Sequence, residues 1–299
     1  MVKKISVFIL IVISGITLYS QQTLPFSENF IPVLQNKDVF FNTQLINPAY
    51  LPDSGKLKIN LFIYNKLVIA VNNPEKGYLI SGATDLGSMN SSLGLNMEYQ
   101  NIGLFEHRSL ITGCKYNWSL TEHSNINIGL NIGVWQSRLK YSDPLPQLPS
   151  LYVTINKKWG TQPYTRLGVS GNFKNHGFGI SYDFFPIKIK TQTSEDYLKD
   201  NGLIINYQGS FKFLRTFYFI PEVYGCFTNT ETYGIITAKI KYKDFITAGF
   251  LYNSKKSTGL MISGIIIKRI KIGYFYEKEN SGSNATINGL HGLNLGVML

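Results

Sequence analysis

Apolar and polar side chains alternate at every second position along most of this chain. In NINIGLNIGV, residues 125–134, Ile, Leu and Val occupy one set of positions, and Asn and Gly occupy the other. Successive side chains of a β-strand point to opposite faces, so this segment predicts a strand with one apolar and one small or polar face. The same alternation is found in SLGLNMEYQ, GFGISYDF, ITAGFLY and RIKIGYFY. No helical period of useful length intervenes, and the sequence therefore predicts an all-β fold.

About fourteen segments of this kind follow one another from residue 57 to the end of the chain. Most of them are about 9 to 12 residues long, whereas strands of soluble proteins average about 5–6 residues. A tilted strand needs about 9–11 residues to cross a membrane, so the lengths favour transmembrane strands. The expected strands cover residues 57–65, 77–86, 91–101, 107–118, 124–136, 163–173, 176–184, 202–213, 216–226, 231–242, 244–253, 256–267, 269–278 and 286–299.

The connections between the expected strands alternate in length. Those after the sixth, eighth, tenth and twelfth strands have about one to three residues, whereas those after the fifth and seventh have about 26 and 17. Outer-membrane barrels have tight turns on the periplasmic side and longer loops outside, and a soluble β-sandwich has no reason to sort its turns in this way. Closure of the sheet also removes the edges that hydrocarbon does not tolerate. We therefore expect a transmembrane antiparallel β-barrel of about 14 strands with a polar lumen.

The amino-acid composition also favours a protein embedded in a membrane. Charged residues make up 16% of the chain, compared with about 25% in typical globular proteins. Without Lys3 and Lys4 the chain has 29 − 2 = 27 basic and 18 acidic residues, a balance that suits anionic lipid headgroups or an acidic partner better than nucleic acid. Cys114 and Cys226 lie inside expected strands; a disulfide is possible, but two separate buried thiols are favoured.

The first twenty residues predict a cleaved signal peptide. Lys3 and Lys4 precede the apolar run Ile5 to Leu18 of 14 residues, which is short for a spanning helix that needs about 20. An uncleaved anchor is the alternative. The expected organisation is a signal peptide at 1–20, an N-terminal periplasmic arm at 21–56 and an outer-membrane barrel at 57–299.

The residues that follow the leader carry a family resemblance. QQTLPFSENF, then FFNTQLINPAY, then the strand KLKINLFIYNK resemble the PorP/SprF family of Bacteroidota, whose members start with a Gln-Gln-Pro-Phe-Ser-like stretch and continue to Asn-Pro-Ala-Tyr. YLISGATDL, SSLGLNMEYQNIG and NINIGLNIGVWQS are similar to its later strands, so the resemblance spans essentially the whole mature chain. The chain departs from the family in the inserted IPVLQNKDVF, in Leu51-Pro52-Asp53 and in the loop 137–162.

The resemblance implies a non-enzymatic outer-membrane protein of the type IX secretion and gliding machinery in a Gram-negative bacterium. Its expected partners are outer-membrane lipid, type IX secretion components and the C-terminal domain of a secreted surface cargo. The arm and the loops 137–162 and 185–201 are the expected contact surfaces, and either loop could add strands or plug the lumen. The alternatives are a passive diffusion channel or transporter, which needs an open lumen and usually a ring of charges, and a surface adhesin or enzyme scaffold.

Asn47, Pro48, Ala49 and Tyr50 are the candidate partner-binding residues. Asn47 can hydrogen-bond to its own turn, Pro48 fixes φ, Ala49 permits close packing, and Tyr50 can bury a ring while its hydroxyl is satisfied. The hypothesis is a rigid periplasmic clasp that holds the arm against or inside the barrel mouth. A plain turn before the first strand is the alternative.

Residues typical of catalysis or cofactor binding are scattered. His107, His123, His176 and His291 occur singly, and no local spacing brings a nucleophile, a histidine and a carboxylate together. There is no phosphate-binding G-x-x-x-x-G-K-[ST] loop, no H-E-x-x-H and no metal-type cysteine spacing. We expect no catalytic, cofactor-binding or metal site, no nucleic-acid partner and no small-molecule substrate.

Overall fold

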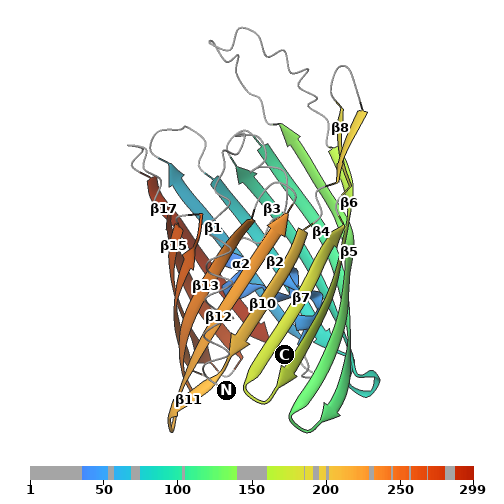
Figure 1. Cartoon of the computed structure of the whole chain (residues 1–299). Helices are drawn as coiled ribbons and strands as arrows, with labels where there is room; N and C mark the ends of the chain where they lie inside the picture. Colours follow the sequence, from blue (N-terminus) through green and yellow to red (C-terminus); the bar gives the residue numbers. More distant parts are fainter. Residues whose placement is uncertain are drawn as a thin grey trace.

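The computed structural model shows a closed antiparallel β-barrel (Figure 1). One sheet runs in the order β10-β7-β6-β5-β4-β3-β2-β1-β17-β16-β15-β14-β13-β12-β11, and β10 also pairs with β12. Because β10 and β11 both lie along β12, they form one broken strand, and the described wall has fourteen strands, as the sequence predicts. The structure describes residues 36–52, 57–68, 75–102, 105–139, 160–184, 186–190, 195–199, 202–228, 232–243, 245–255, 257–267, 269–279 and 287–299.

Every strand of the wall coincides with a segment of alternating side chains. β4 and β5 are longer than expected and are the tallest part of the wall. The strands are β1 (Lys58–Val68), β2 (Glu75–Asp85), β3 (Ser91–Ile102), β4 (Phe105–Thr121), β5 (Ser124–Leu139), β6 (Gly160–Phe173), β7 (His176–Phe184), β10 (Gly202–Gly209), β11 (Phe211–Leu214), β12 (Phe217–Thr228), β13 (Thr232–Tyr242), β14 (Ile246–Asn253), β15 (Ser257–Ile267), β16 (Ile270–Glu279) and β17 (Ile287–Met298).

The two faces of the wall differ in the way that the alternation predicts. On β5, Ile128 and Ile132 are 54% and 53% exposed on the outer face, whereas Asn127 and Asn131 are buried inside. The outer belt of aliphatic and aromatic side chains continues around the barrel. A belt of this kind replaces water contact by contact with lipid chains.

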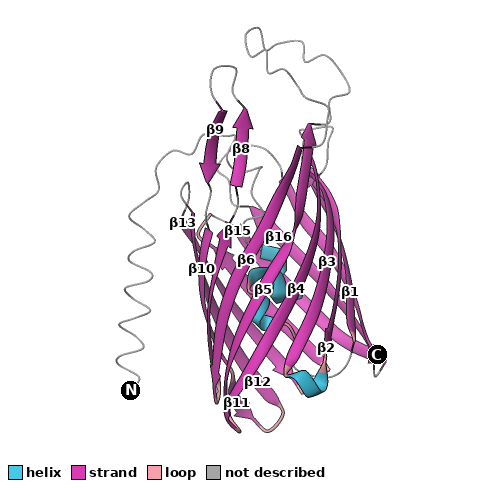
Figure 2. Ribbon diagram, turned by 90° about the vertical axis from the view of Figure 1, so that its right-hand side faces the viewer, coloured by secondary structure: helices cyan, strands magenta, loops and turns pink. Residues whose placement is uncertain are grey.

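The two ends of the barrel carry connections of different length. At one end, which we call the short-turn end, lie the tight turns between β4 and β5, β6 and β7, β11 and β12, and β13 and β14, together with Leu299. The other end is called the long-loop end. There β8 (Pro186–Lys190) and β9 (Glu195–Lys199) form a hairpin beyond the wall (Figure 2), so the connection 185–201 adds strands. Residues 140–159 of the loop 137–162 lie outside the described residues.

A short helical segment fills part of the barrel interior (Figures 1 and 2). We call residues 36–52 the plug; it contains α2 (Asn36–Phe41), α3 (Thr43–Ile46) and η2 (Pro48–Tyr50). A further 3-10 turn, η3 (Gly87–Met89), connects β2 and β3 at the short-turn end. No described helix is long and apolar enough to cross a membrane.

The lumen is less uniformly polar than expected. A buried hydrophobic cluster joins the plug to inward-facing side chains of the wall. Many inward positions are Asn, Ser or Gly, but β1 turns Phe62 and Tyr64 inward and β16 turns Phe275 inward. These rings are inside because the plug offers them apolar side chains to pack against. The cluster contains Val39, Phe40, Leu45, Ile46, Phe62, Tyr64, Leu79, Ile111, Trp135, Tyr164, Ile204, Tyr224, Cys226, Tyr233, Ile235, Leu251, Met261 and Phe275.

The cysteines are both free, and one of them differs from the expectation. Cys226 is buried, but Cys114 is exposed on the outer face. The expectation of two buried thiols was wrong for Cys114 because it shares the outward parity of Leu110 and Tyr116 on β4. The expected signal peptide at 1–20 lies outside the described residues.

Candidate functional site

The side chain of Asn47 connects the plug to the wall. Its Oδ1 accepts the backbone N–H of Ala49 at 2.9 Å, which caps the η2 turn, and Pro48 occupies the first turn position. Its Nδ2 donates to the backbone carbonyl oxygens of Val169 on β6 and Ile180 on β7, at 3.1 and 3.2 Å. Asn47 is 0% exposed. One amide therefore shapes its own turn and holds that turn against two strands.

Tyr50 ends the same turn and reaches a third strand. The Nδ2 of Asn206 on β10 donates to its hydroxyl oxygen. Burial raises the pKa of Tyr50 to about 12; the hydrogen bond from Asn206 lowers the pKa, and the negative charge of Glu222 raises it further. The buried phenol therefore keeps its proton at pH values at which an exposed tyrosine would ionise.

Three inward glycines form the surface on which the four residues Asn47–Tyr50 rest. A Cβ on Gly129 would lie 2.5 Å from the backbone nitrogen of Ala49, and one on Gly168 would lie 2.8 Å from Cδ of Pro48. A Cβ on Gly179 would lie 2.9 Å from Nδ2 of Asn47 and closer still to the hydroxyl of Tyr50. Gly129 and Gly168 are direct cross-strand partners. We call Gly129, Gly168 and Gly179 the glycine floor; at Gly129 only glycine permits this approach of two backbones, and at the other two a Cβ would overlap side chains of the plug.

Cationic side chains of the wall donate hydrogen bonds to backbone carbonyl oxygens of the plug. Arg166 on β6 donates through Nη1 to the carbonyl oxygen of Ile46 at 3.1 Å, and Lys115 on β4 donates to that of Leu51. Lys239 on β13 donates to the carbonyl oxygen of Val39 at 3.3 Å. The last carbonyls of a short helix have no partner within the helix and carry partial negative charge. The wall therefore supplies hydrogen-bond donors to three separate carbonyl oxygens of the plug.

Two of these cations are themselves fixed by carboxylates. Arg166 forms a two-point ion pair with Asp183 on β7, in which Nη2 lies 2.5 Å from Oδ2. Lys239 lies 2.7 Å from Glu222 on β12. Both pairs are almost completely buried in the lumen. Burial of a charge is costly unless it is paired and hydrogen-bonded, so these pairs are preorganised to receive the plug.

The first helix of the plug packs through aromatic rings on the other half of the barrel. Phe41 stacks on Phe62 of β1 with ring centroids 5.0 Å apart, and Phe40 lies 5.6 Å from Phe275 of β16. The ammonium group of Lys239 lies 5.2 Å from the centre of the Phe40 ring. The plug thus spans the lumen: its first helix contacts β1, β13 and β16, and its later residues bind β4, β6, β7 and β10.

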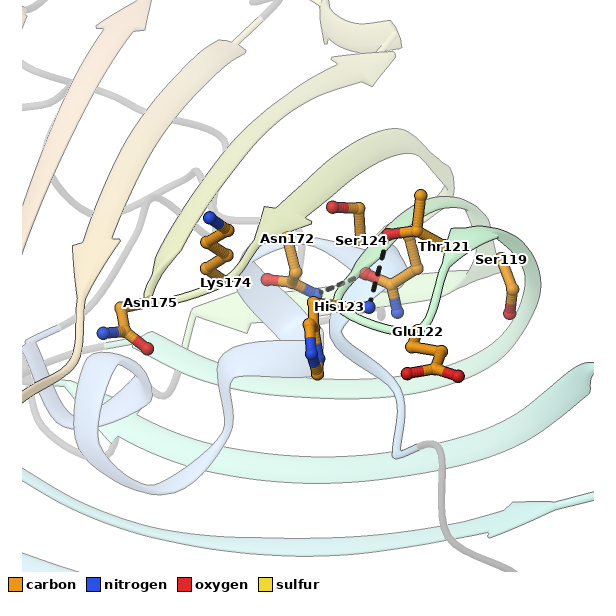
Figure 3. A pocket seen from close by; sticks show the side chains of 9 residues that line it. Ser119, Thr121, Glu122, His123, Ser124, Asn172, Lys174 and Asn175 are labelled. Carbon is orange, nitrogen blue, oxygen red and sulfur yellow. Dashed lines mark hydrogen bonds between the residues drawn. The ribbon is translucent and has the colours of Figure 1, made fainter.

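A polar hollow lies below the glycine floor at the short-turn end (Figure 3). It has a volume of about 520 Å³ and lies between the β4–β5 and β6–β7 turns. Asn172 donates to Asn125 at 3.0 Å across its wall, and the Asn127–Ser170 pair separates it from Gly129 and Gly168. The lining residues are Ser119, Thr121, Glu122, His123, Ser124, Asn125, Asn172, Lys174 and Asn175.

Replacing Tyr50 by phenylalanine is expected to change how stability depends on pH. From pH 10, the ordinary pKa of tyrosine, up to about 12, the folded state retains a proton that the unfolded state has released. The free energy of unfolding therefore falls as pH rises through this window. The Tyr50→Phe variant lacks this contribution and should show a shallower fall. Denaturant unfolding at several pH values between 8 and 12 tests this, and identical slopes would contradict it.

The structure brings together the four residues that the sequence singled out, and it places them inside the barrel. The sequence did not identify Arg166, Lys115 and Lys239, the wall residues that bind other carbonyl oxygens of the plug. The available signal was a charged side chain at an inward position of an otherwise small or polar strand face. Within the described part of the chain, no group of three or more His, Cys, Asp or Glu residues is placed to hold a metal ion.

Comparisons with solved structures agree with the barrel. A monoaromatic hydrocarbon channel, the TodX deltaS2S3 mutant, is 12% identical with a TM-score of 0.52, covering 86% of this chain and 93% of that one. The CymD monoaromatic hydrocarbon channel is 12% identical with a TM-score of 0.51, covering 86% and 91%. The Acinetobacter baumannii outer membrane protein Omp33 is 10% identical with a TM-score of 0.48, covering 82% and 100%. At these identities the likeness concerns the fold.

No curated protein sequence matches this chain. A family model does match it, and the match extends over residues 32–297, from just before the plug to the last strand. The matched family is described as the type IX secretion system membrane protein PorP/SprF. Together with the barrel, this match assigns the protein to the outer membrane of a Gram-negative bacterium. The chain belongs to the PorP/SprF family of type IX secretion system membrane proteins.

Proposed function

We propose that this protein is a non-enzymatic binding barrel of the type IX secretion machinery. It anchors a secreted surface cargo through the C-terminal domain of that cargo and connects the outer membrane to periplasmic components. The short-turn end faces the periplasm, as tight turns do in outer-membrane barrels. On that side the polar hollow offers a contact surface.

The observation that carries this proposal is the plug. Its hydrogen bonds reach β4, β6, β7, β10 and β13, and its rings pack on β1 and β16. A lumen crossed by a segment fixed at so many points suits a protein that binds, whereas conduction requires an open path. The plug ends at the short-turn end, where the carbonyl oxygen of Pro52 accepts a hydrogen bond from Ser92 at the start of β3, so a periplasmic contact made there is linked directly to the barrel wall.

The rival function is a passive diffusion channel. Planar-bilayer recordings separate the two, because a plugged barrel should give no steady single-channel conductance. Ohmic channels in the wild-type protein would contradict the binding role. The decisive positive experiment is purification of the intact complex in mild detergent, followed by mass spectrometry. We expect type IX components and a secreted protein with a C-terminal sorting domain, and recovery of the barrel alone from cross-linked cells would oppose the proposal.

The double variant Asn47→Ala/Tyr50→Ala tests the clasp. It should reduce cargo secretion and complex recovery more than it reduces the amount of folded barrel in the membrane, because the wall strands pair without these side chains. Secretion of the cargo and heat-modifiable barrel in membranes are measured in parallel. Gly82→Ala is the matched control, since a Cβ there would meet nothing nearer than the Lys58 carbonyl oxygen at 4.0 Å. Equal losses of secretion and barrel would reduce the four residues to a folding element.

A further inference from the structure

Three cations gather on the outer face of the wall near the long-loop end. Lys76 on β2 and Arg108 on β4 are exposed, and Arg138 on β5 is partly exposed. They share the outward parity of the lipid belt: Arg108 lies two positions from Leu110, and Lys76 lies two positions from Tyr78. Arg108 pairs directly with Gln136, so Arg138 is its diagonal neighbour, at roughly 7–8 Å. We call Lys76, Arg108 and Arg138 the basic patch.

A hydrogen-bond network fixes the two guanidinium groups. Arg138 is ion-paired through Nε with Glu106, which also accepts from the hydroxyl of Tyr99 at 3.2 Å. Arg108 donates through Nε to Gln136 at 2.5 Å. A guanidinium has five N–H donors in a planar fork, so a bond through Nε fixes the plane of the whole fork. With three cations and the Glu106 carboxylate, the described patch is net positive.

The apolar belt begins immediately below the basic patch. Met97, Leu110 and Val134 are 49%, 44% and 42% exposed on the outer face of β3, β4 and β5. Elsewhere around the long-loop end, aromatic side chains such as Tyr252 and Tyr274 occupy the corresponding outer positions. The β2–β5 sector therefore combines a charged row at headgroup level with an apolar surface at acyl-chain level.

We infer that the basic patch binds the phosphate of a lipid A-type glycolipid whose acyl chains lie on Met97, Leu110 and Val134. Two oriented guanidinium groups match the geometry of a phosphate, and an ammonium group adds charge beside them. The site opens sideways into the bilayer, which a soluble partner does not reach. The choice of glycolipid rests on the proposed orientation, in which the long-loop end faces the outer leaflet.

Binding of lipids to the purified full-length barrel in detergent, followed by native mass spectrometry, tests the inference. The probes are lipid A, the same lipid A after enzymatic removal of its phosphates, phosphatidylglycerol and inorganic phosphate. We expect wild-type protein to bind lipid A best, and removal of the phosphates or the Arg108→Ala substitution to weaken binding about tenfold, the size of one charge-assisted hydrogen bond. Lys76→Ala should weaken it less.

The variants are chosen to keep the barrel intact. Arg108→Ala and Lys76→Ala leave the Arg138–Glu106 pair in place, and Lys278→Ala removes an exposed cation on β16, outside the patch, as the control. Equal affinity for intact and dephosphorylated lipid A would overturn the inference, as would equal loss in Lys278→Ala. Equal affinity for phosphatidylglycerol and lipid A would overturn the choice of lipid. The assay involves neither cargo nor secretion, so its outcome is independent of the proposed secretion role.

Discussion

Replacing Gly168 by valine is expected to displace the plug while the barrel wall remains assembled. The Cβ of valine would overlap Pro48 and Asn47, and Asn47 cannot retreat without breaking its bonds to Val169 and Ile180. Overpacking of a tight site costs about 1–3 kcal/mol, and each buried polar group left without a partner costs about 1–3 kcal/mol more. The sum of these costs is comparable with the free energy that holds a short segment against the wall, so the plug should dissociate from the glycine floor.

The wall should tolerate this substitution because valine favours strands and the backbone ladder of β5, β6 and β7 is unaffected. We expect unchanged heat-modifiability, a lower thermal midpoint, and ion conductance in planar bilayers that the wild type lacks. The matched control is Gly82→Val, at a position on β2 where a Cβ meets only the Lys58 carbonyl oxygen at 4.0 Å. A silent Gly168→Val barrel with wild-type stability would contradict the view that the glycine floor seats the plug.

The wall could be predicted from the sequence because its cause is local. Period-two alternation depends only on neighbouring residues, so NINIGLNIGV specifies strand, outer face and inner face together. The number of alternating segments predicted the number of strands. The lengths of the connections then predicted that short turns lie at one end of the barrel and longer loops at the other. β4 and β5 run further than expected because the added residues, among them Glu106, Ser119 and Arg138, are polar and do not continue the apolar alternation.

The plug could not be located in the same way because its contacts are non-local. Asn47 and Tyr50 are recognisable as a turn, but their partners Val169 and Asn206 lie more than a hundred residues later. The inward parity of Phe62 was visible in the sequence, yet only the presence of Phe41 explains why an aromatic ring should enter a polar lumen. The glycine floor is similar: its three glycines become a seat only when β5, β6 and β7 are paired.

Replacing Arg166 by alanine is expected to destabilise the barrel by about 3–5 kcal/mol, because Asp183 would remain buried without its cation. The substitution also removes the donor to the Ile46 carbonyl oxygen, which then retains the hydroxyl of Ser181 at 2.8 Å. Denaturant unfolding in detergent or vesicles measures the loss. Lys174→Ala, at the exposed β6–β7 turn, is the matched control and should change the unfolding free energy by less than about 0.5 kcal/mol.

The double variant Arg166→Met/Asp183→Leu separates the electrostatic cost from the anchoring of the plug. Apolar replacement of a buried ion pair is often neutral for stability, so the unfolding free energy should return close to that of the wild type. The carbonyl end of α3 lacks its guanidinium partner both in Arg166→Ala and in the double variant, so intermittent conductance, absent from the wild type, is expected in both. If the double variant had the unfolding free energy of the wild type and showed no conductance, the ion pair would stabilise only the wall and would not anchor the plug. If neither were restored, Arg166 and Asp183 would form a folding core on which the wall and the plug depend together.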